Sequence, residues 1–174
     1  KGLWPALWML PQDDAYGPWA ASGEIDVMEI VGERPHEYLG SVHFGSSFPK
    51  RSLVTHVHKF AAGGSVADFH VYAVEWEPGE IRWLVDGTLW ATQSFWWSCS
   101  VPRNGRGVEA RSAKDLNPWP APFDQPFYIV MNVAVGGDFP GVPNAATQFP
   151  AELAVDYVRV YDRVGGYGEP KARG

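Results

Sequence analysis

The chain has 174 residues, with 20 acidic and 14 basic side chains and a formal net charge of −6. This acidic balance argues against nucleic acid or an anionic membrane surface as a partner, and it suits a neutral substrate. No apolar run approaches the length that spans a bilayer, and the single Cys99 excludes an intrachain disulfide while leaving the redox compartment open.

Helix signals are nearly absent, whereas 19 Gly and 15 Pro separate short apolar stretches, which is typical of an all-β sandwich or barrel. In chain order, strands are predicted over residues 4–10, 24–31, 39–45, 53–58, 69–77, 81–85, 88–93, 127–135 and 154–162. Pro78-Gly79 and Asp86-Gly87 mark two hairpin turns, of which Asp-Gly is the stronger signal. Residues 98–122 are predicted to be irregular.

One stretch of strand-forming aliphatic residues carries three acids, Glu24, Asp26 and Glu29. Successive side chains of a strand alternate between its faces, so Glu24 and Asp26 share one face while Ile25 and Val27 point into the core. By the same alternation Glu29 would point to the opposite face, away from Glu24 and Asp26. Like charges crowded on one sheet face repel, so the arrangement calls for a functional explanation.

A β-bulge of one extra residue around Val27–Met28 would return Glu29 to the acidic face, and bulges are common beside active sites. At a rise of about 3.3 Å per residue, Glu24 and Glu29 would then lie about two strand steps apart. Two carboxyl groups roughly 5–5.5 Å apart suit a retaining glycosidase, with one as nucleophile and the other as general acid/base. The alternative is a half-solvated strand whose outer face is acidic, but strands tolerate Asp poorly.

Four segments carry a resemblance to a known family. Residues 23–29 read GEIDVME and follow GLWPALWMLP at residues 2–11; FDQPFYIVMNVAVGG at residues 123–137 and VDYVRVY at residues 155–161 come later. Together, in this order, they resemble glycoside hydrolase family 16, in particular its laminarinase-like branch.

The resemblance implies a jelly-roll β-sandwich with a concave substrate cleft, acting inside β-1,3-glucan or related β-glucan chains with retention of anomeric configuration. By motif position Glu24 would be the nucleophile, Asp26 its assisting carboxylate and Glu29 the acid/base, with no cofactor required for catalysis. The resemblance also implies a secreted enzyme that is monomeric when its domain is complete. The inserted Met28 separates this branch from relatives with a regular Glu-x-Asp-x-Glu strand.

Residues 1–162 are expected to form the catalytic domain and residues 163–174 a tail or linker stub. In relatives a segment precedes the point that matches Lys1, so the sandwich is expected to lack N-terminal strands. Unpaired strand edges favour aggregation, and we expect the isolated chain to be poorly soluble or inactive.

Nine Trp residues give an unusually aromatic chain. Sugar rings stack their C–H faces on aromatic rings and need polar partners for their hydroxyls. By resemblance, Trp8 and Trp19 line the subsites beside the scissile bond. Trp119 flanks the irregular insertion, where it either contacts substrate as part of the cleft wall or packs in the core. Core packing is the expectation for Trp76, Trp83 and Trp90, and either core packing or a cleft wall for Trp96 and Trp97.

His43 lies where relatives carry a histidine beside the catalytic carboxyls, and the alternative is an ordinary strand histidine. Asn132 interrupts an apolar strand, and a buried amide must be satisfied; by resemblance it faces sugar hydroxyls in the cleft. His56 and His58 form a His-x-His pair, but without a third ligand a solvated strand face is the better interpretation.

A structural calcium ion is implied by resemblance alone. Asp156 matches a calcium-binding Asp of the family, whose other ligands lie near the N-terminus. Calcium needs six to eight oxygen ligands, so an incomplete site, or a plain solvent-facing Asp156, is an equal alternative.

The sequence thus predicts an endo-acting, retaining β-1,3-glucanase. Within the family, the alternatives are enzymes for mixed-linked glucan, agar or carrageenan. From a different class, the alternative is a non-catalytic β-glucan-binding module, although such relatives typically lack one or both glutamates. An adhesion or structural sandwich would leave the acids unexplained.

Overall fold

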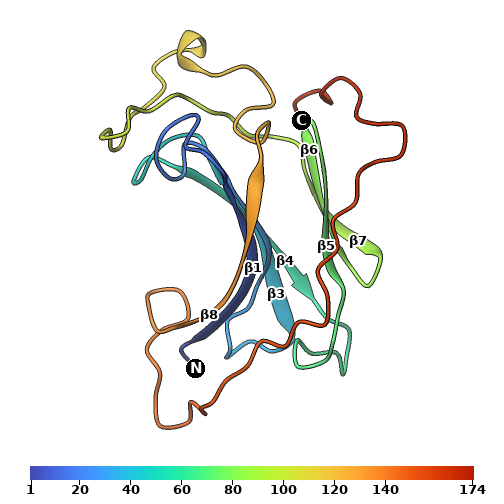
Figure 1. Ribbon diagram of the computed structural model, residues 1–174. Coiled ribbons are helices and arrows are strands. Elements are labelled where there is room, and N and C mark those ends of the chain that lie inside the picture. Colours follow the sequence, from blue (N-terminus) through green and yellow to red (C-terminus); the bar gives the residue numbers. More distant parts are fainter.

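The computed structural model describes all 174 residues, and strands make up nearly all of its regular structure (Figure 1). The elements are β1 (Leu3–Pro11), β2 (Glu24–Glu29), β3 (Glu37–Phe44), β4 (Ser52–Lys59), β5 (Tyr72–Glu77), β6 (Glu80–Val85), β7 (Thr88–Gln93), the short 3-10 helix η1 (Ala113–Asp115) and β8 (Phe127–Val135). No helix has the length and apolar character of a membrane span.

The strands form two antiparallel sheets. The larger has the order β4-β3-β2-β1-β8 and the smaller the order β5-β6-β7. Figure 1 shows the smaller sheet standing beside the curved larger one, with the irregular insertion after β7 arching over one end. The predicted all-β sandwich is confirmed, and every strand predicted before residue 136 is present.

Apolar side chains from both sheets meet in one core. Ile25, Val42 and Phe44 of the larger sheet pack with Ile81 and Trp83 of the smaller, and all five are buried. Burying a large apolar side chain contributes about 1.5–3 kcal/mol, so this contact is the main force that holds the sheets together.

The turn between β6 and β7 is the predicted Asp-Gly hairpin. Asp86 has φ 50° and Gly87 has φ 76°. Consecutive residues with positive φ are what a two-residue hairpin of matching twist requires, and Gly and Asp tolerate that conformation.

The predicted β-bulge lies in β2. Asp26 pairs with Ser41, and Glu29 pairs with Leu39. Between these pairs, Val27 and Met28 of β2 stand opposite the single Gly40 of β3. The extra residue restores Glu29 to the face that carries the other two acids, as the sequence predicts.

The bulge changes which side chain enters the core. Val27 was expected to point inward, but it is only half-buried. Met28 is buried instead and packs with Ile30, Tyr38 and Val85. Because the alternation shifts by one residue at the bulge, the inward position passes from Val27 to Met28.

The strand predicted over residues 154–162 is absent. The segment pairs with no strand, and Val158, Val160 and Tyr161 are exposed. Its alternating pattern is that of a strand, but a strand also needs an edge that accepts its backbone hydrogen bonds, and no sheet of the structure takes it up.

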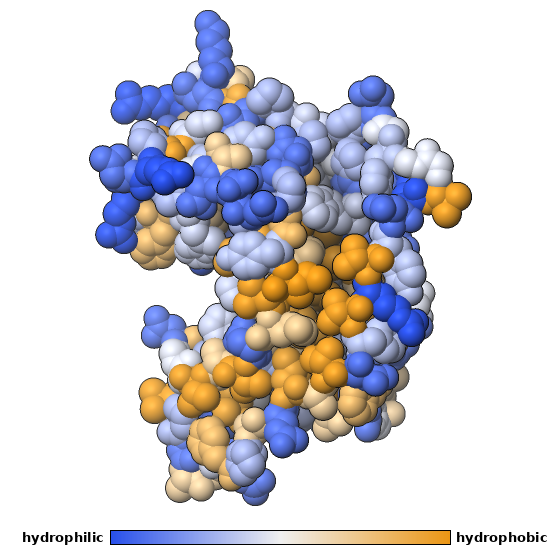
Figure 2. Space-filling model, in the orientation of Figure 1, coloured by the Kyte–Doolittle hydropathy of each residue, from blue (hydrophilic) through white to orange (hydrophobic).

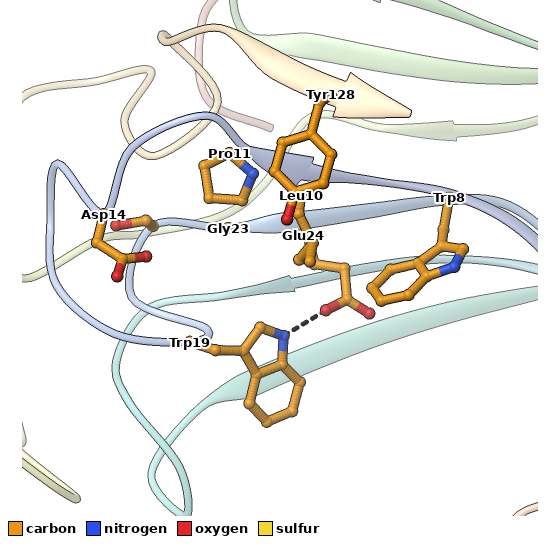
Figure 3. Close-up of a pocket in the computed structure, with 9 residues that line it drawn as sticks. Trp8, Leu10, Pro11, Asp14, Trp19, Gly23, Glu24 and Tyr128 are labelled. Atoms are coloured by element: carbon orange, nitrogen blue, oxygen red, sulfur yellow. Dashed lines mark hydrogen bonds between the residues drawn. The ribbon is translucent and has the colours of Figure 1, made fainter. Parts of the chain in front are cut away.

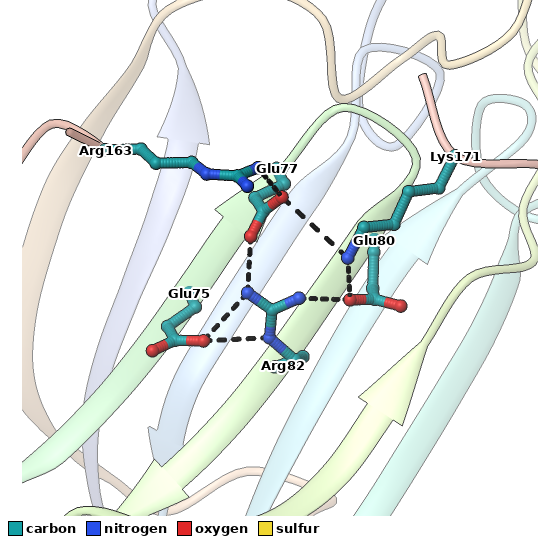
Figure 4. Close-up of polar contacts among 6 residues, drawn as sticks. All are labelled: Glu75, Glu77, Glu80, Arg82, Arg163 and Lys171. Carbon is teal, nitrogen blue, oxygen red and sulfur yellow. Dashed lines mark hydrogen bonds and ion pairs between the residues drawn. The ribbon is translucent and has the colours of Figure 1, made fainter. Parts of the chain in front are cut away.

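The segment expected to be a tail, residues 163–174, lies against the smaller sheet. Its backbone donates two hydrogen bonds at the end of this sheet, from Lys171 N to Pro78 O in the turn after β5 at 2.9 Å and from Gly174 N to Ser94 O after β7 at 2.8 Å. Its side chains join an ion-pair network on β5 and β6 (Figure 4), made of Glu75, Glu77, Glu80, Arg82, Arg163 and Lys171.

The molecular surface is hollowed on one side. Figure 2 shows an indentation in the orientation of Figure 1, with apolar side chains gathered beside and below it. On β8, Ile129 and Met131 share the inner face of the larger sheet with Met9 and Leu7, yet both remain roughly half exposed, at 45% and 48%. The smaller sheet therefore covers only part of that inner face.

Candidate active site

The three acids of β2 lie on one face of the larger sheet. Asp26 is 2% exposed and Glu29 9%, while Glu24 at the start of the strand is half-buried. Ser41 of β3 donates a hydrogen bond from its hydroxyl to Oε2 of Glu29 over 3.1 Å. Three carboxyl groups are thus removed from water beside one another, which is costly unless they share protons.

A histidine completes this group. His43 stands opposite Glu24 in the pairing of β2 with β3. Its Nε2 lies 3.7 Å from Oε1 of Glu24 and 3.4 Å from Oδ2 of Asp26. Burial lowers the pKa of His43, while the charge of Glu24 works in the opposite direction.

Burial raises the pKa of all three acids. It is the largest cause for Glu24, whose pKa rises to about 7, and the charge of Asp26 adds to it. Burial, followed by the charge of Glu29, raises the pKa of Asp26 well above its ordinary value. Burial also raises the pKa of Glu29, against the hydrogen bond from Ser41. Near neutral pH the site therefore retains protons, as a general acid requires.

Trp19 lies over the entrance to this group. Its indole N–H donates a hydrogen bond to Oε2 of Glu24 (Figure 3). Its ring lies 5.4 Å from that of His43 and 6.5 Å from that of Phe48, and the Arg51 guanidinium sits 5.1 Å from its centroid. Trp19 is nevertheless 38% exposed, so aromatic surface remains available to a ligand.

A cavity of about 450 Å³ opens beside Glu24. Figure 3 shows Glu24 between Trp8 and Trp19, with Tyr128 above. The lining residues are Trp8, Leu10, Pro11, Asp14, Trp19, Ser22, Gly23, Glu24 and Tyr128. Aromatic faces beside a few carboxyl oxygens are the surface that a sugar ring needs.

Asn132 acts on this cavity through Trp8. Its Oδ1 accepts the indole N–H of Trp8 over 2.7 Å, across the pairing of β1 with β8. The amide is therefore satisfied by a protein partner, and it fixes the orientation of an aromatic ring that lines the cavity.

Trp119 lies apart from the cavity beside Glu24. It stacks on the buried Trp96 with centroids 4.7 Å apart, and its indole donates to the Lys171 carbonyl over 2.7 Å. Trp83 is fully buried as expected, and Trp76 and Trp90 pack against the core.

The remaining metal candidates do not converge. Asp156 lies in the unpaired, exposed segment near the C-terminus. Nε2 of His56 lies 3.2 Å from Oε1 of Gln93, and His58 packs against the Trp90 ring. The calcium site that Asp156 suggested stays a prediction. The side chains that do come within metal-binding range are Glu24, Asp26 and His43.

Sequence reasoning missed three residues of the site. Tyr128 lines the cavity, and counting back from Asn132 in steps of two along β8 would have placed it on that face. Ser41 lies two positions before His43 on β3 and could have been found in the same way. Arg51 precedes β4, outside any strand, and no sequence signal pointed to it.

The chain is similar to known proteins of one family. The family model described as Glycosyl hydrolases family 16 matches residues 1–95. The chain is 47% identical over 165 residues to a glucan endo-1,3-beta-glucosidase A1 of Niallia circulans, covering 92% of this chain and 22% of that protein. It is 40% identical to a beta-1,3-glucan-binding protein of Penaeus monodon, covering 78% of this chain and 39% of the relative.

A solved structure is similar as well. The endo-beta-1,3-glucanase from Pyrococcus furiosus superposes with a TM-score of 0.64 at 36% identity, covering 86% of this chain and 51% of that one. The chain thus spans between about a fifth and a half of the length of these three proteins.

Proposed function

Because this chain belongs to glycosyl hydrolase family 16, we propose that it cleaves internal β-1,3 linkages of β-glucans with retention of configuration. The observation that carries the proposal is the β-bulge, which brings Glu24, Asp26 and Glu29 to one face beside the cavity. The linkage is proposed from relatives described as acting on 1,3-β-glucans.

In the proposed mechanism Glu24 attacks the anomeric carbon while Glu29 protonates the departing glycosidic oxygen. Glu29 then removes a proton from the water that releases the covalent glycosyl-enzyme. Two features of the site support these roles. The Trp19 N–H stabilises the ionised form of Glu24, and the shared burial of the acids favours a proton on Glu29.

Asp26 assists in this scheme by its position. It lies between the two glutamates along β2, and its charge raises the pKa of Glu24. When Asp26 holds a proton, Glu24 can remain ionised without a second buried charge next to it. The pair therefore divides one negative charge, as coupled carboxyl groups do.

The cavity supports a neutral sugar chain as substrate. Trp8, Trp19 and Tyr128 offer aromatic faces, whereas Asp14 and Glu24 provide the acidic groups of the lining. A sulfated chain such as carrageenan would meet these carboxyl groups unfavourably. We also propose that the protein works outside the cell, because a polysaccharide is too large to enter the cell. We further propose that it works as a monomer.

The roles are tested with Glu24→Ala and Glu29→Ala on laminarin and on a glucoside with a good leaving group. Both variants should lose hydrolysis by orders of magnitude while keeping the wild-type circular dichroism spectrum. Added azide should rescue both on the activated glucoside, giving the α-glucosyl azide with Glu24→Ala and the β-glucosyl azide with Glu29→Ala. Near-normal hydrolysis in either variant would refute the assignment.

The second candidate is a module that binds β-glucan without cleaving it, favoured by the similarity to the glucan-binding protein of Penaeus monodon. Release of reducing sugar decides between the two. A panel of laminarin, lichenan, agarose and carrageenan tests the specificity at the same time. Binding to laminarin without release of reducing sugar would favour the module.

A further inference from the structure

The group of Glu24, Asp26 and His43 has a geometry that suits more than glycoside chemistry. One ligand atom of each lies within 4.8 Å of the other two. Nε2 of His43 lies 3.4 Å from Oδ2 of Asp26 and 3.7 Å from Oε1 of Glu24. Zinc binds oxygen and nitrogen at about 2.0–2.1 Å, so two ligands at a tetrahedral angle lie about 3.3–3.4 Å apart. The observed separations are close to that value.

A buried oxygen without a partner points to the same place. Oδ2 of Asp26 has no hydrogen bond, and Asp26 is 2% exposed. It faces the imidazole of His43 without the alignment of a hydrogen bond. A buried polar atom left unsatisfied costs about 1–3 kcal/mol, which a bound cation would recover.

Trp19 leaves the required oxygen of Glu24 free. The indole N–H bonds to Oε2, while Oε1 is the oxygen that faces His43. Glu24 can therefore ligate a cation without losing its bond to Trp19. Because Glu24 also lines the cavity, the fourth position of a tetrahedral site can be taken by water.

We propose that Zn²⁺ binds between Oε1 of Glu24, Oδ2 of Asp26 and Nε2 of His43 and thereby blocks the nucleophile. An imidazole with two carboxylates favours zinc over calcium or magnesium, which prefer all-oxygen sites. The binding stands on the geometry alone, and only the block of catalysis rests on the proposed function.

Two features limit the affinity. The guanidinium of Arg51 stands over Trp19 and repels a cation. Nδ1 of His43 is buried without a hydrogen-bond acceptor, and loss of such a partner typically weakens metal binding 10–100-fold. The expected site is therefore reversible, inhibitory and weaker than a structural zinc site.

Isothermal titration of the chelator-treated protein with zinc chloride tests the binding without substrate. We expect one zinc per chain, with the Kd raised at least tenfold in His43→Gln and in Asp26→Asn. His36→Gln is the matched control, because His36 is a surface histidine outside the group of Glu24, Asp26 and His43, and its ring bonds the Gly64 carbonyl. Co²⁺ should give the intense visible absorption of a tetrahedral complex in the wild type and lose it in His43→Gln.

The outcomes separate the two proposals. Absence of stoichiometric zinc binding, or unchanged affinity in a correctly folded His43→Gln, overturns the site. Hydrolysis of laminarin that continues while zinc is bound overturns the block of the nucleophile. Zinc binding in a protein that cleaves no glucan supports the site and contradicts the proposed function instead.

Discussion

His43 lies directly across from Glu24 in the pairing of β2 with β3, with Nε2 3.7 Å from Oε1. Burial shifts the pKa values of the two groups in opposite directions. It lowers the pKa of His43 and raises the pKa of Glu24. Burial thus disfavours the charged form of both groups, and Glu24 changes its protonation state close to neutral pH. The pH dependence of this site should follow from that balance.

Relative to the wild type, Glu24→Gln should stabilise the fold at pH 8, and this stabilisation should be much smaller at pH 5. Burial, then the charge of Asp26, raises the pKa of Glu24 from 4.5 to about 7. An acid with a raised folded-state pKa contributes its stability below the unfolded value, and the contribution is lost as the pH rises through 7. Gln escapes that loss, which amounts to about 3 kcal/mol at most.

Urea unfolding of both proteins at pH 5 and pH 8 measures this effect. Glu33→Gln is a control, because Glu33 is exposed and forms an ion pair only with Lys1, away from the three acids of β2. A difference in unfolding free energy between wild type and Glu24→Gln that is the same at both pH values would contradict the raised pKa.

Trp19→Phe should lower kcat/KM about 10- to 100-fold, because it removes a hydrogen bond to a charged carboxylate worth about 1.5–3 kcal/mol. That bond also lowers the pKa of Glu24, so the acidic limb of the pH–rate profile should move to higher pH. Phe48→Leu removes a neighbouring ring but keeps the N–H, and it should leave the acidic limb in place. An unshifted limb in Trp19→Phe would contradict the role of the indole.

Arg51→Met should raise the pKa of His43 and reduce activity. Burial lowers this pKa most, Glu24 opposes it, and the charge of Arg51 lowers it further. Arg51 also lowers the pKa of Asp26 and lies over the Trp19 ring. Histidine NMR titration gives the pKa, and Arg51→Lys, which keeps the charge but not the planar group, separates charge from stacking. A pKa of His43 that is equal in Arg51→Met and wild type would show that the charge does not reach it.

Gly40→Ala should destabilise the protein by about 1–3 kcal/mol, the usual cost of overpacking a core. A Cβ at Gly40 would lie 2.5 Å from the ring of Trp83, which is fully buried. Thermal unfolding measures the loss. Gly168→Ala controls for removing a glycine from the chain, because nothing lies within 4 Å of a Cβ at that position. A wild-type melting temperature for Gly40→Ala would mean that the ring has room to move.

The β-bulge could be predicted from sequence because alternation fails at a single point. Three acids cannot share a face of a regular strand at the spacing of Glu24, Asp26 and Glu29, and one inserted residue resolves the conflict. The side chain that gains the core position could not be predicted in the same way. Either Val27 or Met28 is apolar enough, and the packing of Tyr38 and Val85 decides for Met28.

The missing strand over residues 154–162 shows the opposite case. Its apolar alternation is real, but pairing depends on a free sheet edge in the right place, which the segment itself does not encode. The surroundings of Trp119 could not be predicted for a related reason. From its position beside the insertion, Trp119 could reach either the cleft or the core. In the structure it stacks on Trp96 and donates a hydrogen bond to the Lys171 carbonyl.

Trp83 links the two sheets by a hydrogen bond, and this link has a consequence for the behaviour of the site on heating. Its indole N–H donates to the backbone carbonyl of Asp26 over 2.8 Å, directly before the β-bulge. A displacement of the smaller sheet relative to the larger one would therefore move the backbone at Asp26, next to the β-bulge that orients the three acids. We therefore expect the proposed hydrolysis to be lost on heating when the contact between the two sheets loosens, before the strands themselves unfold. A tighter contact between the sheets should then raise the temperature up to which the activity persists.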